Sequence, residues 1–522
     1  MASRTRKFFL NSLSLCISAL IMRGVGVAFN IYVSSRAGTV AMGLYSLSFG
    51  AYGFFITLAC FGINLGVTRL VSDALGENNP EKAKRSMKIS LIFCSVTGLA
   101  AATVMFFLSP HLATALGDRR CELSLRAMAI SLFPISVCSC LSGYFTAVRR
   151  VKVSSSMLTA IQILKIFITV ALLSLLMPYG EEYACLSLVL GLTFCEILSL
   201  TVSYILYVID RKKHFSSPSV SCQAQDSSLF YKLISITLPV TVASCLRSLL
   251  GSLSHILIPR GLKKSGSSWE SALSSYGLLQ SVVLPLILFP SAFISCFSGL
   301  LIPEVSECRV QRDFTRLSRI SYRILTLALF FSIGVSGIMT FLASDIGNSI
   351  YSSAEAGKYI RMLAPLIPVM YIDSSVDAIL KGMGKQVYSM VVNIIDAGSA
   401  CIIIFLLVPK FGLYGYIISI YATEILNTTL SLVGMIKCAH PKMRPYHQVF
   451  LPILCICGAT ALSNIILRLI YHPFSPIIEL VLHICLVVCL YGIFMLLTNA
   501  IGSDEKEVIY QSLAIKNRAS HK

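Results

Sequence analysis

The chain contains the same pattern of apolar segments twice, and this internal repeat is the strongest constraint on its fold. At a displacement of 234 residues, Val71 aligns with Val305 and Pro134 with Pro368. Further matches at this displacement are Ser72/Ser306, Met105/Met339, Phe107/Phe341, Leu108/Leu342, Val153/Val387 and Ser155/Ser389. With changed loop lengths, the pairs Arg23/Arg247, Arg36/Arg260 and Glu196/Glu424 also match. Repeats of this kind predict two similar halves, an arrangement typical of transporters.

The composition predicts a polytopic membrane protein. Of the 522 residues 56% are hydrophobic and 13% are charged, with a mean hydropathy of +0.79, which is more apolar material than a soluble core can use. Since about 20 apolar residues cross a bilayer as a helix, we expect an all-α fold with fourteen transmembrane helices. They are predicted near 8–33, 43–65, 87–109, 125–148, 155–177, 184–209, 231–258, 274–301, 320–343, 359–380, 389–408, 413–436, 450–470 and 477–499.

The repeat and the loops together predict the domain organisation. We expect an N-terminal six-helix lobe over 1–209, a polar cytoplasmic linker over 210–230 and a C-terminal six-helix lobe over 231–437. Residues 438–522 have no counterpart in the repeat, so they are predicted to form two additional helices and a cytoplasmic tail.

Basic residues predict the orientation. Most of the 43 Lys and Arg fall in the tails and in alternate loops, so the positive-inside rule favours cytoplasmic N- and C-termini and a place in the cytoplasmic membrane. The net charge of +19 then reflects topology and attraction to anionic membrane lipids. Nucleic-acid binding is not expected, because no soluble basic domain is present.

Two arginines in matched helices are the leading candidates for substrate binding. Arg23 lies mid-helix with Asn30 two turns further on, while Arg247, Gly251 and His255 recur every four residues along one helix face. A guanidinium offers a permanent charge and a planar fork of donors that suits phosphate oxygens. The alternative is that each arginine pairs with an intramembrane carboxylate such as Glu196 or Glu424, and His255 alone is commonly a hydrogen-bonded interior histidine.

Acidic residues within predicted helices suggest coupling to an ion. Asn393 and Asp396 are three residues apart and share a helix face, so their oxygens could hold sodium or exchange a proton. Glu196 and Glu424 are further coupling candidates because the repeat matches them. The alternative is that such acids merely neutralise a basic group. Beyond Na+ or H+, no cofactor is expected.

Prolines and glycines predict interruptions in three helices. Pro285 and Pro290 interrupt one predicted helix, and Pro365 and Pro368 interrupt another, because proline removes a backbone donor. We also expect a hinge at 23–26, where two glycines follow Arg23.

The first hundred residues resemble a known family. Similar stretches are Arg23-Gly24, Gly43-Leu44-Tyr45, Phe61-Gly62-Ile63-Asn64, Arg69-Leu70-Val71-Ser72 and the run from Asn79 to Arg85. On these motifs the chain is similar to the stage V sporulation protein B branch of the multidrug/oligosaccharidyl-lipid/polysaccharide exporter superfamily, which is related to lipid II flippases. The resemblance extends over almost the whole chain.

The resemblance implies two six-helix bundles around a V-shaped cavity, with the last two helices lining a groove for a polyprenyl tail. It implies essential cavity arginines, carried here to Arg23 and, by position and charge, to Arg247 and Arg260. It also implies a sodium site at Asn393 and Asp396, although their spacing here is three residues rather than four.

These observations favour a flippase, acting as a monomer and not an enzyme, for a polyprenyl-pyrophosphate-linked saccharide. The cargo is either a peptidoglycan precursor or a surface-polysaccharide unit, and the role in spore, wall or capsule synthesis stays open. The second hypothesis is a cation-coupled multidrug antiporter of the same superfamily, against which the matched arginines argue. The third is a membrane-embedded glycosyl- or acyltransferase, which would need acids or histidines clustered at the membrane surface.

Overall fold

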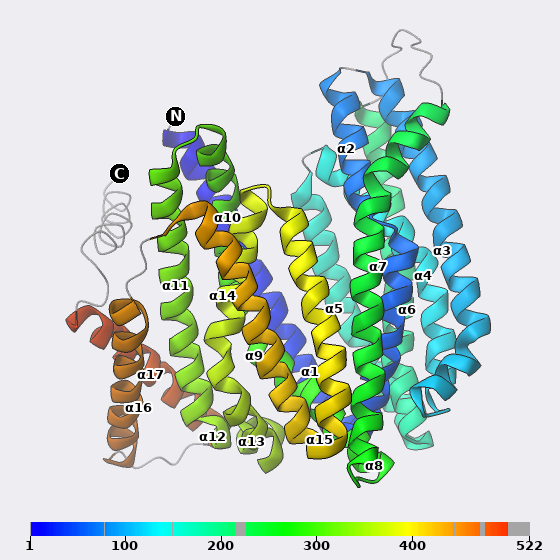
Figure 1. Ribbon diagram of the computed structural model, residues 1–522. Helices are drawn as coiled ribbons and strands as arrows, with labels where there is room; N and C mark the ends of the chain where they lie inside the picture. The colour runs from blue at the N-terminus through cyan, green and yellow to red at the C-terminus, as the bar shows by residue number, and fades with distance from the viewer. Residues whose placement is uncertain are drawn as a thin grey trace. The chain divides into compact units, whose positions relative to one another are not determined.

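Every regular element in the described part of the protein is helical (Figure 1). The computed structural model describes residues 2–77, 79–148, 150–214, 226–441, 445–469 and 475–498. The α-helices are α1 (Ala2–Cys60), α2 (Ile63–Gly76), α3 (Pro80–Leu116), α4 (Cys121–Ala147), α5 (Val151–Leu176), α6 (Glu181–His214), α7 (Asp226–Lys264), α8 (Trp269–Gly277), α9 (Leu284–Leu288), α10 (Ser291–Val310), α11 (Phe314–Phe341), α12 (Ala343–Tyr351), α13 (Ala354–Leu363), α14 (Ile367–Gly382), α15 (Gln386–Ala439), α16 (Leu451–Leu469) and α17 (Pro476–Leu497). The predicted all-α class is confirmed.

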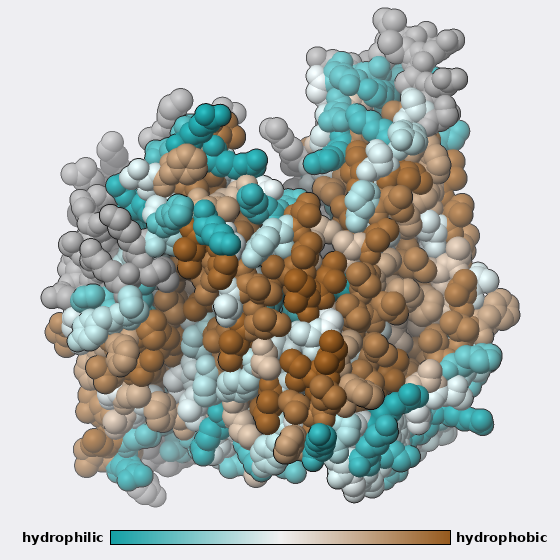
Figure 2. Space-filling view, viewed as in Figure 1, coloured by the Kyte–Doolittle hydropathy of each residue, from teal (hydrophilic) through white to brown (hydrophobic). Residues whose placement is uncertain are grey.

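Twelve helical segments of the described chain are long and apolar enough to cross a membrane. Two of them, Ile21–Gly76 and Gln386–Ala439, have more than twice the length that one crossing needs. On the visible face in Figure 2, apolar side chains cover the middle of the helices and polar ones gather towards their ends. The chain is therefore a multi-pass membrane protein, while the count of fourteen spans stays a prediction.

Glycines interrupt both of the double-length helices. The backbone leaves helical geometry at Gly38 (φ 81°) in α1 and at Gly412 (φ 57°) in α15. A positive φ is inexpensive only for glycine. Both positions lie between helices that the sequence predicted as separate, which explains why one continuous run of helix holds two apolar stretches. By contrast, Gly24 and Gly26 have helical geometry, and the hinge expected beside them stays a prediction.

The two predicted proline interruptions are confirmed. Near Pro285 and Pro290, the predicted helix 274–301 is divided into α8, a π-helical segment (Leu278–Val283), α9 and α10. Near Pro365 and Pro368, a 3-10 turn (Ala364–Leu366) separates α13 from α14. Each proline removes a backbone donor, which weakens the regular hydrogen-bond ladder near it.

Repeat-matched residues have the same structural roles. Asn79 caps α3 by accepting from the Lys82 N–H at 3.0 Å, and Asp313 caps α11 by accepting from the Arg316 N–H at 2.9 Å. The two caps are separated by the repeat displacement. The buried core clusters of the two copies also contain matched pairs, namely Val71/Val305, Ala74/Cys308, Ala83/Leu317, Phe145/Ile379 and Tyr207/Met435. The sequence repeat is thus a structural repeat.

Internal contacts divide the chain into two compact units. Unit 1 contains Met1–Ile31, Val282–Val392 and Ile420–Lys522, and unit 2 contains Tyr32–Ser281 and Asn393–Ser419. Helices α1 and α15 contribute to both units. The predicted lobe boundaries at 209 and 231 stay a prediction, since contacts rather than the repeat define these units. Of the predicted linker, residues 215–225 lie outside the described residues, as does the tail from 499.

Within unit 2, α7 packs beside α2 and α3 (Figure 1). Within unit 1, the two helices that follow the repeat pack on α11. Tyr491 of α17 donates to the Phe330 carbonyl at 2.9 Å, and Ile456 of α16 lies against Gly337. The predicted additional helices are therefore integral to this unit.

Candidate functional site

Arg23 lies in unit 1 beside the proline interruption between α9 and α10. Its Nη1 donates to the Ser291 hydroxyl at 3.4 Å, and the neighbouring Gly24 faces the ring of Phe289. Ser291 itself donates to the Leu288 carbonyl at 2.6 Å, so its oxygen is oriented to accept. The backbone break thus supplies the partner that holds the arginine.

The guanidinium of Arg23 keeps most of its donors available. Among the described residues of unit 1, it makes no ion pair with a carboxylate, and its side chain is exposed. A guanidinium carries five N–H donors, of which Ser291 occupies one. Glu424 lies in the same unit, yet the pairing of Arg23 with it that we considered as an alternative is not observed. Asn30, two turns further along α1, is half-buried.

Arg247 lies on α7 in unit 2, and contacts one to two turns further along attach this helix to its neighbours. His255, two turns further on, shares a 2.6 Å hydrogen bond with the Tyr276 hydroxyl, and Ser252 donates to the Gly50 carbonyl at 2.6 Å. A Cβ on Gly50 would lie 2.7 Å from the Cβ of His255, so the two helices touch closely there. His255 is therefore a hydrogen-bonded interior histidine. Within the described part of unit 2, Arg247 is exposed and forms no ion pair.

The second matched pair, Arg36 and Arg260, has two different environments. The guanidinium of Arg36 lies 6.0 Å from the centre of the Tyr32 ring, whereas Arg260 donates to the carbonyl of Ala115 in the last turn of α3. A cation at a helix C-terminus is favourable because the free carbonyls carry partial negative charge. Arg260 thus has a structural partner, and its substrate role stays a prediction.

The candidate coupling residues are placed as follows. Asn393 and Asp396 lie on the part of α15 that belongs to unit 2, where the Asp396 carbonyl accepts from Ser399 at 2.8 Å. Glu196 lies on α6 and Lys165 on the neighbouring α5, and their charges attract each other without forming an ion pair. Glu424 belongs to unit 1. Within the described residues no group of three His, Cys, Asp or Glu side chains could hold a metal ion, and sodium binding stays a prediction.

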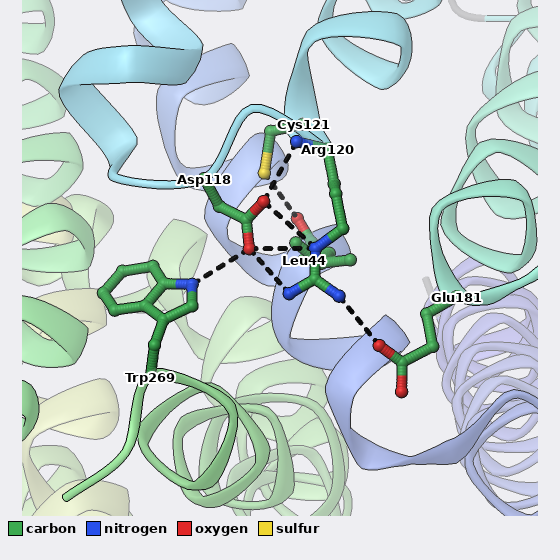
Figure 3. A network of polar contacts seen from close by, with 6 residues as sticks. All are labelled: Leu44, Asp118, Arg120, Cys121, Glu181 and Trp269. Carbon is green, nitrogen blue, oxygen red and sulfur yellow. Dashed lines mark hydrogen bonds and ion pairs between the residues drawn. The ribbon is translucent and has the colours of Figure 1, made fainter.

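A polar network that the sequence did not predict joins three turns of unit 2, and we call Asp118, Arg120, Glu181 and Trp269 the clasp (Figure 3). Arg120 donates from Nη2 to Asp118 at 2.8 Å and from Nη1 to Glu181 at 2.9 Å. The indole N–H of Trp269 donates to the same Asp118 oxygen at 2.9 Å. The clasp thus connects the turn before α4 with the starts of α6 and α8.

Asp118 is the centre of the clasp and is almost fully buried. Burial, the largest single influence, acts to raise the pKa of its carboxyl, but hydrogen bonds from Arg120 and Trp269 together outweigh it and lower the pKa below its usual value. The same carboxylate raises the pKa of Arg120. The only sequence signal for the clasp is the single tryptophan of the chain, which is the first residue of α8.

A second network, also missed from the sequence, closes the opposite ends of α4 and α6. The buried carboxylate of Asp210 pairs with Arg150 and accepts a hydrogen bond from the Tyr144 hydroxyl at 2.9 Å. Tyr144 is itself buried and packs edge-on against Tyr207. These residues fasten the end of α6 to the turn after α4.

Two of the apolar repeated helices carry an arginine that has no ion pair within the described part of its own unit, an arrangement typical of a membrane transport protein. Comparison with known proteins gives the family. The model of the polysaccharide biosynthesis protein family matches residues 8–308, more than half of the chain, and the MatE model matches 228–406. The chain belongs to the polysaccharide biosynthesis protein family, within the multidrug/oligosaccharidyl-lipid/polysaccharide exporter superfamily.

Two curated relatives come from Bacillus subtilis (strain 168). Stage V sporulation protein B is 25% identical over 518 residues, covering 97% of this chain and 98% of the relative, and the lipid II flippase MurJ is 20% identical over 401 residues, covering 72% and 73%. Among solved structures, an inward closed lipid II flippase MurJ matches with a TM-score of 0.68 at 13% identity, covering 92% of this chain and 98% of that one. An inward-facing MATE transporter matches with 0.57 at 15%, covering 81% and 94%. The resemblance predicted from the sequence is confirmed.

Proposed function

We propose that the protein is a flippase that moves a polyprenyl-pyrophosphate-linked saccharide across the cytoplasmic membrane by alternating access. Family membership and similarity over nearly full length to a sporulation protein, with a further relative named as a lipid II flippase, support this class. The cargo would be a peptidoglycan precursor or a surface-polysaccharide unit. No covalent step is required, so the protein would act as a transporter and not as an enzyme.

The observation that most directly supports the proposal is that Arg23 has no carboxylate partner among the described residues of its unit. Its guanidinium is exposed on an apolar helix and has one long hydrogen bond to Ser291 and no carboxylate partner within its described unit. An ionised group on a membrane helix is costly unless it faces water, protein or ligand. A pyrophosphate would satisfy the remaining donors by charge-assisted hydrogen bonds. Arg247, which also has no ion pair among the described residues of its unit, would supply a second set of guanidinium donors.

Ion coupling and topology complete the proposal. Binding of sodium or a proton at Asn393 and Asp396 would reset the transport cycle, because a ligand shifts an equilibrium only towards the state that it binds more tightly. Both termini would be cytoplasmic, and the protein would act as a monomer. The saccharide would be released into the water outside the membrane, while α16 and α17 accommodate the polyprenyl chain in the bilayer.

The test replaces Arg23 or Arg247 by Ala in protein reconstituted into proteoliposomes and measures translocation of a fluorescent polyprenyl-pyrophosphate saccharide. We expect at least a tenfold loss for each variant, since a charge-assisted hydrogen bond contributes about 1.5–3 kcal/mol. Arg126→Ala is the control, because Arg126 is already paired with Glu122 at 2.7 Å. Unchanged translocation by both variants at normal protein levels would refute the proposal.

A cation-coupled multidrug antiporter is the second candidate function, favoured by the MatE match over 228–406. Such a protein would bind cationic drugs, for which carboxylates rather than unpaired arginines are the natural partners. Drug-resistance profiles of cells expressing the protein separate the two candidates, because a flippase for an anionic lipid confers no resistance to cationic drugs.

A further inference from the structure

Unit 1 contains a cavity of about 510 Å³ whose lining residues have no role in the candidate site described above. It lies where the turn between α10 and α11, the turn between α14 and α15, and the last turn of α15 come together. Its lining consists of Arg309, Phe314, Leu317, Met383, Lys385, Lys437, Cys438 and His440. We call it the basic pocket.

The basic pocket combines a cationic rim with an apolar floor. Arg309, Lys385, Lys437 and His440 are exposed, while Leu317 and Met383 are 2% and 5% exposed. Phe314 at its edge is 64% exposed. No carboxylate is among the lining residues. A ligand that satisfied both parts would carry negative charge next to hydrocarbon.

The carboxylates nearest in sequence are engaged elsewhere. Glu304 pairs with Arg316 at 3.2 Å, Glu307 accepts from Gln311 at 3.1 Å, and Asp313 caps α11. Within the described chain, Arg309, Lys385 and Lys437 have no ion pair. The positive charge of the basic pocket is therefore not neutralised by the protein.

The other copy of the repeat shows what is missing. There, the buried carboxylate of Asp210 neutralises Arg150. The match of Glu196 with Glu424, which also places Tyr207 opposite Met435 in the two core clusters, puts Cys438 at the position of Asp210. One copy thus closes this end with an internal ion pair. The other has Cys438 in place of the acid and Gly384 in place of Arg150, and its basic residues come from other positions.

A glycine makes room for one of these cations. Gly384 has a φ of 72°, and a Cβ on it would lie 2.1 Å from Nη1 of Arg309. Only glycine allows both the backbone conformation and this close approach. The guanidinium of Arg309 therefore lies directly on the backbone of the turn at the pocket rim.

We propose that the basic pocket binds the phosphate group of an anionic phospholipid, with the hydrocarbon next to that phosphate packed against Phe314. Basic pockets between membrane helices are well suited to such headgroups. The apolar floor favours a lipid over free phosphate, because a soluble anion gains nothing from Leu317 and Met383. The ligand supplies the basic pocket with a counter-charge, as Asp210 does for Arg150 in the first copy. The basic pocket contains neither of the arginines proposed to bind pyrophosphate, so this proposal does not depend on the proposed function.

The test uses full-length protein extracted from vesicles of phosphatidylcholine with about one fifth phosphatidylglycerol, an amount that gives an anionic surface, and counts retained lipids by native mass spectrometry. We expect selective retention of phosphatidylglycerol by the wild type. The variant Lys385→Gln/Lys437→Gln should lower it roughly tenfold to thirtyfold, because each basic residue near an anionic surface contributes a factor of about five. Cys438→Asp, which removes no basic group, should lower it as well by restoring the internal counter-charge.

The matched control is Lys82→Gln/Lys84→Gln, which also removes two positive charges but from lysines already paired with Glu77 and Glu81. It should retain the lipid as the wild type does. Wild-type retention by the pocket variants, equal loss in the control, or equal retention of phosphatidylcholine would each overturn the proposal. Displacement of the lipid by millimolar inorganic phosphate would do so too, because it would identify a site for the soluble anion.

Discussion

The indole N–H of Trp269 donates a 2.9 Å hydrogen bond to Oδ2 of Asp118, and this single contact joins residues 151 positions apart in the sequence. It connects the turn between α3 and α4 with the start of α8 inside unit 2. The indole also lies against Gly117, where a Cβ would be 3.0 Å from its ring. The contact therefore combines a hydrogen bond to a buried carboxylate with close packing.

Replacing Trp269 by Phe should destabilise the protein by about 1–3 kcal/mol, because Asp118 would lose a donor while remaining buried. Thermal unfolding of the purified protein, followed by far-ultraviolet circular dichroism, measures the effect, because this signal reports helix content rather than tryptophan. Tyr179→Phe is the control, since Tyr179 is 73% exposed. Equal midpoints for wild type and Trp269→Phe would contradict the role of the clasp.

The stabilisation from Asp118 should depend on pH in a defined direction. The hydrogen bonds from Arg120 and Trp269 lower the pKa of this carboxyl in the folded state, so its contribution is fully present above the ordinary value of about 3.9 and is lost as the pH falls through the lower folded value. Between pH 4 and pH 2, Asp118→Asn should lose less stability than the wild type. Parallel stability curves for the two proteins would show that Asp118 has an ordinary pKa.

The interruption of α1 can be tested at its glycine. Nothing lies within 4 Å of a Cβ added to Gly38, so Gly38→Ala would cost only the backbone strain of a conformation that is essentially restricted to glycine, about 1–3 kcal/mol. Gly53 in the same helix also has open space but no positive φ, and Gly53→Ala should stabilise by roughly 0.5–1 kcal/mol. Opposite shifts of the unfolding midpoint are expected, and shifts of the same sign would argue against a fixed bend at Gly38.

Much of the architecture was predictable because it follows from local chemistry. The interruptions at Pro290 and Pro365 follow from a missing backbone donor, and the caps at Asn79 and Asp313 from a side-chain acceptor just before a helix. The repeat, read from Val71 and Val305 and their neighbours, reappears in the two core clusters. Apolar periodicity fixes where helices lie.

The polar networks were not predictable, because they join residues that are far apart in the sequence. Asp118 meets Trp269, and Asp210 meets Arg150, only because folded helices bring distant turns together. Their sequence neighbours carry no motif that pairs them. The arginines illustrate an intermediate case. Position and charge selected Arg247 and Arg260 alike, but only the structure shows that Arg260 is held by a helix end.

The contacts of Asp210 with Arg150 and Tyr144 should stabilise the protein mainly through the ion pair, because breaking that pair leaves a charged group without its partner. Asp210→Asn removes the charge that neutralises Arg150, whereas Tyr144→Phe removes one hydrogen bond and leaves the pair intact. We expect a loss of about 1–3 kcal/mol for the first variant and about 1 kcal/mol for the second. Denaturant titration of both variants gives the ranking, and a larger loss for Tyr144→Phe would mean that the ion pair is not the main contact.

Variants of Glu196 can distinguish a role in ion coupling from simple charge pairing with Lys165. Because Lys165 lies opposite it on α5, Glu196→Gln should leave a lysine without its counter-charge in an apolar helix and should lower stability. The double variant Lys165→Met/Glu196→Gln removes both charges, so we expect it to recover the unfolding midpoint and the translocation rate in proteoliposomes. We expect this outcome because the two opposite charges attract each other on neighbouring helices. A double variant that is stable yet inactive would instead assign Glu196 to the coupling ion, and a double variant no more stable than Glu196→Gln would show that the two charges do not interact.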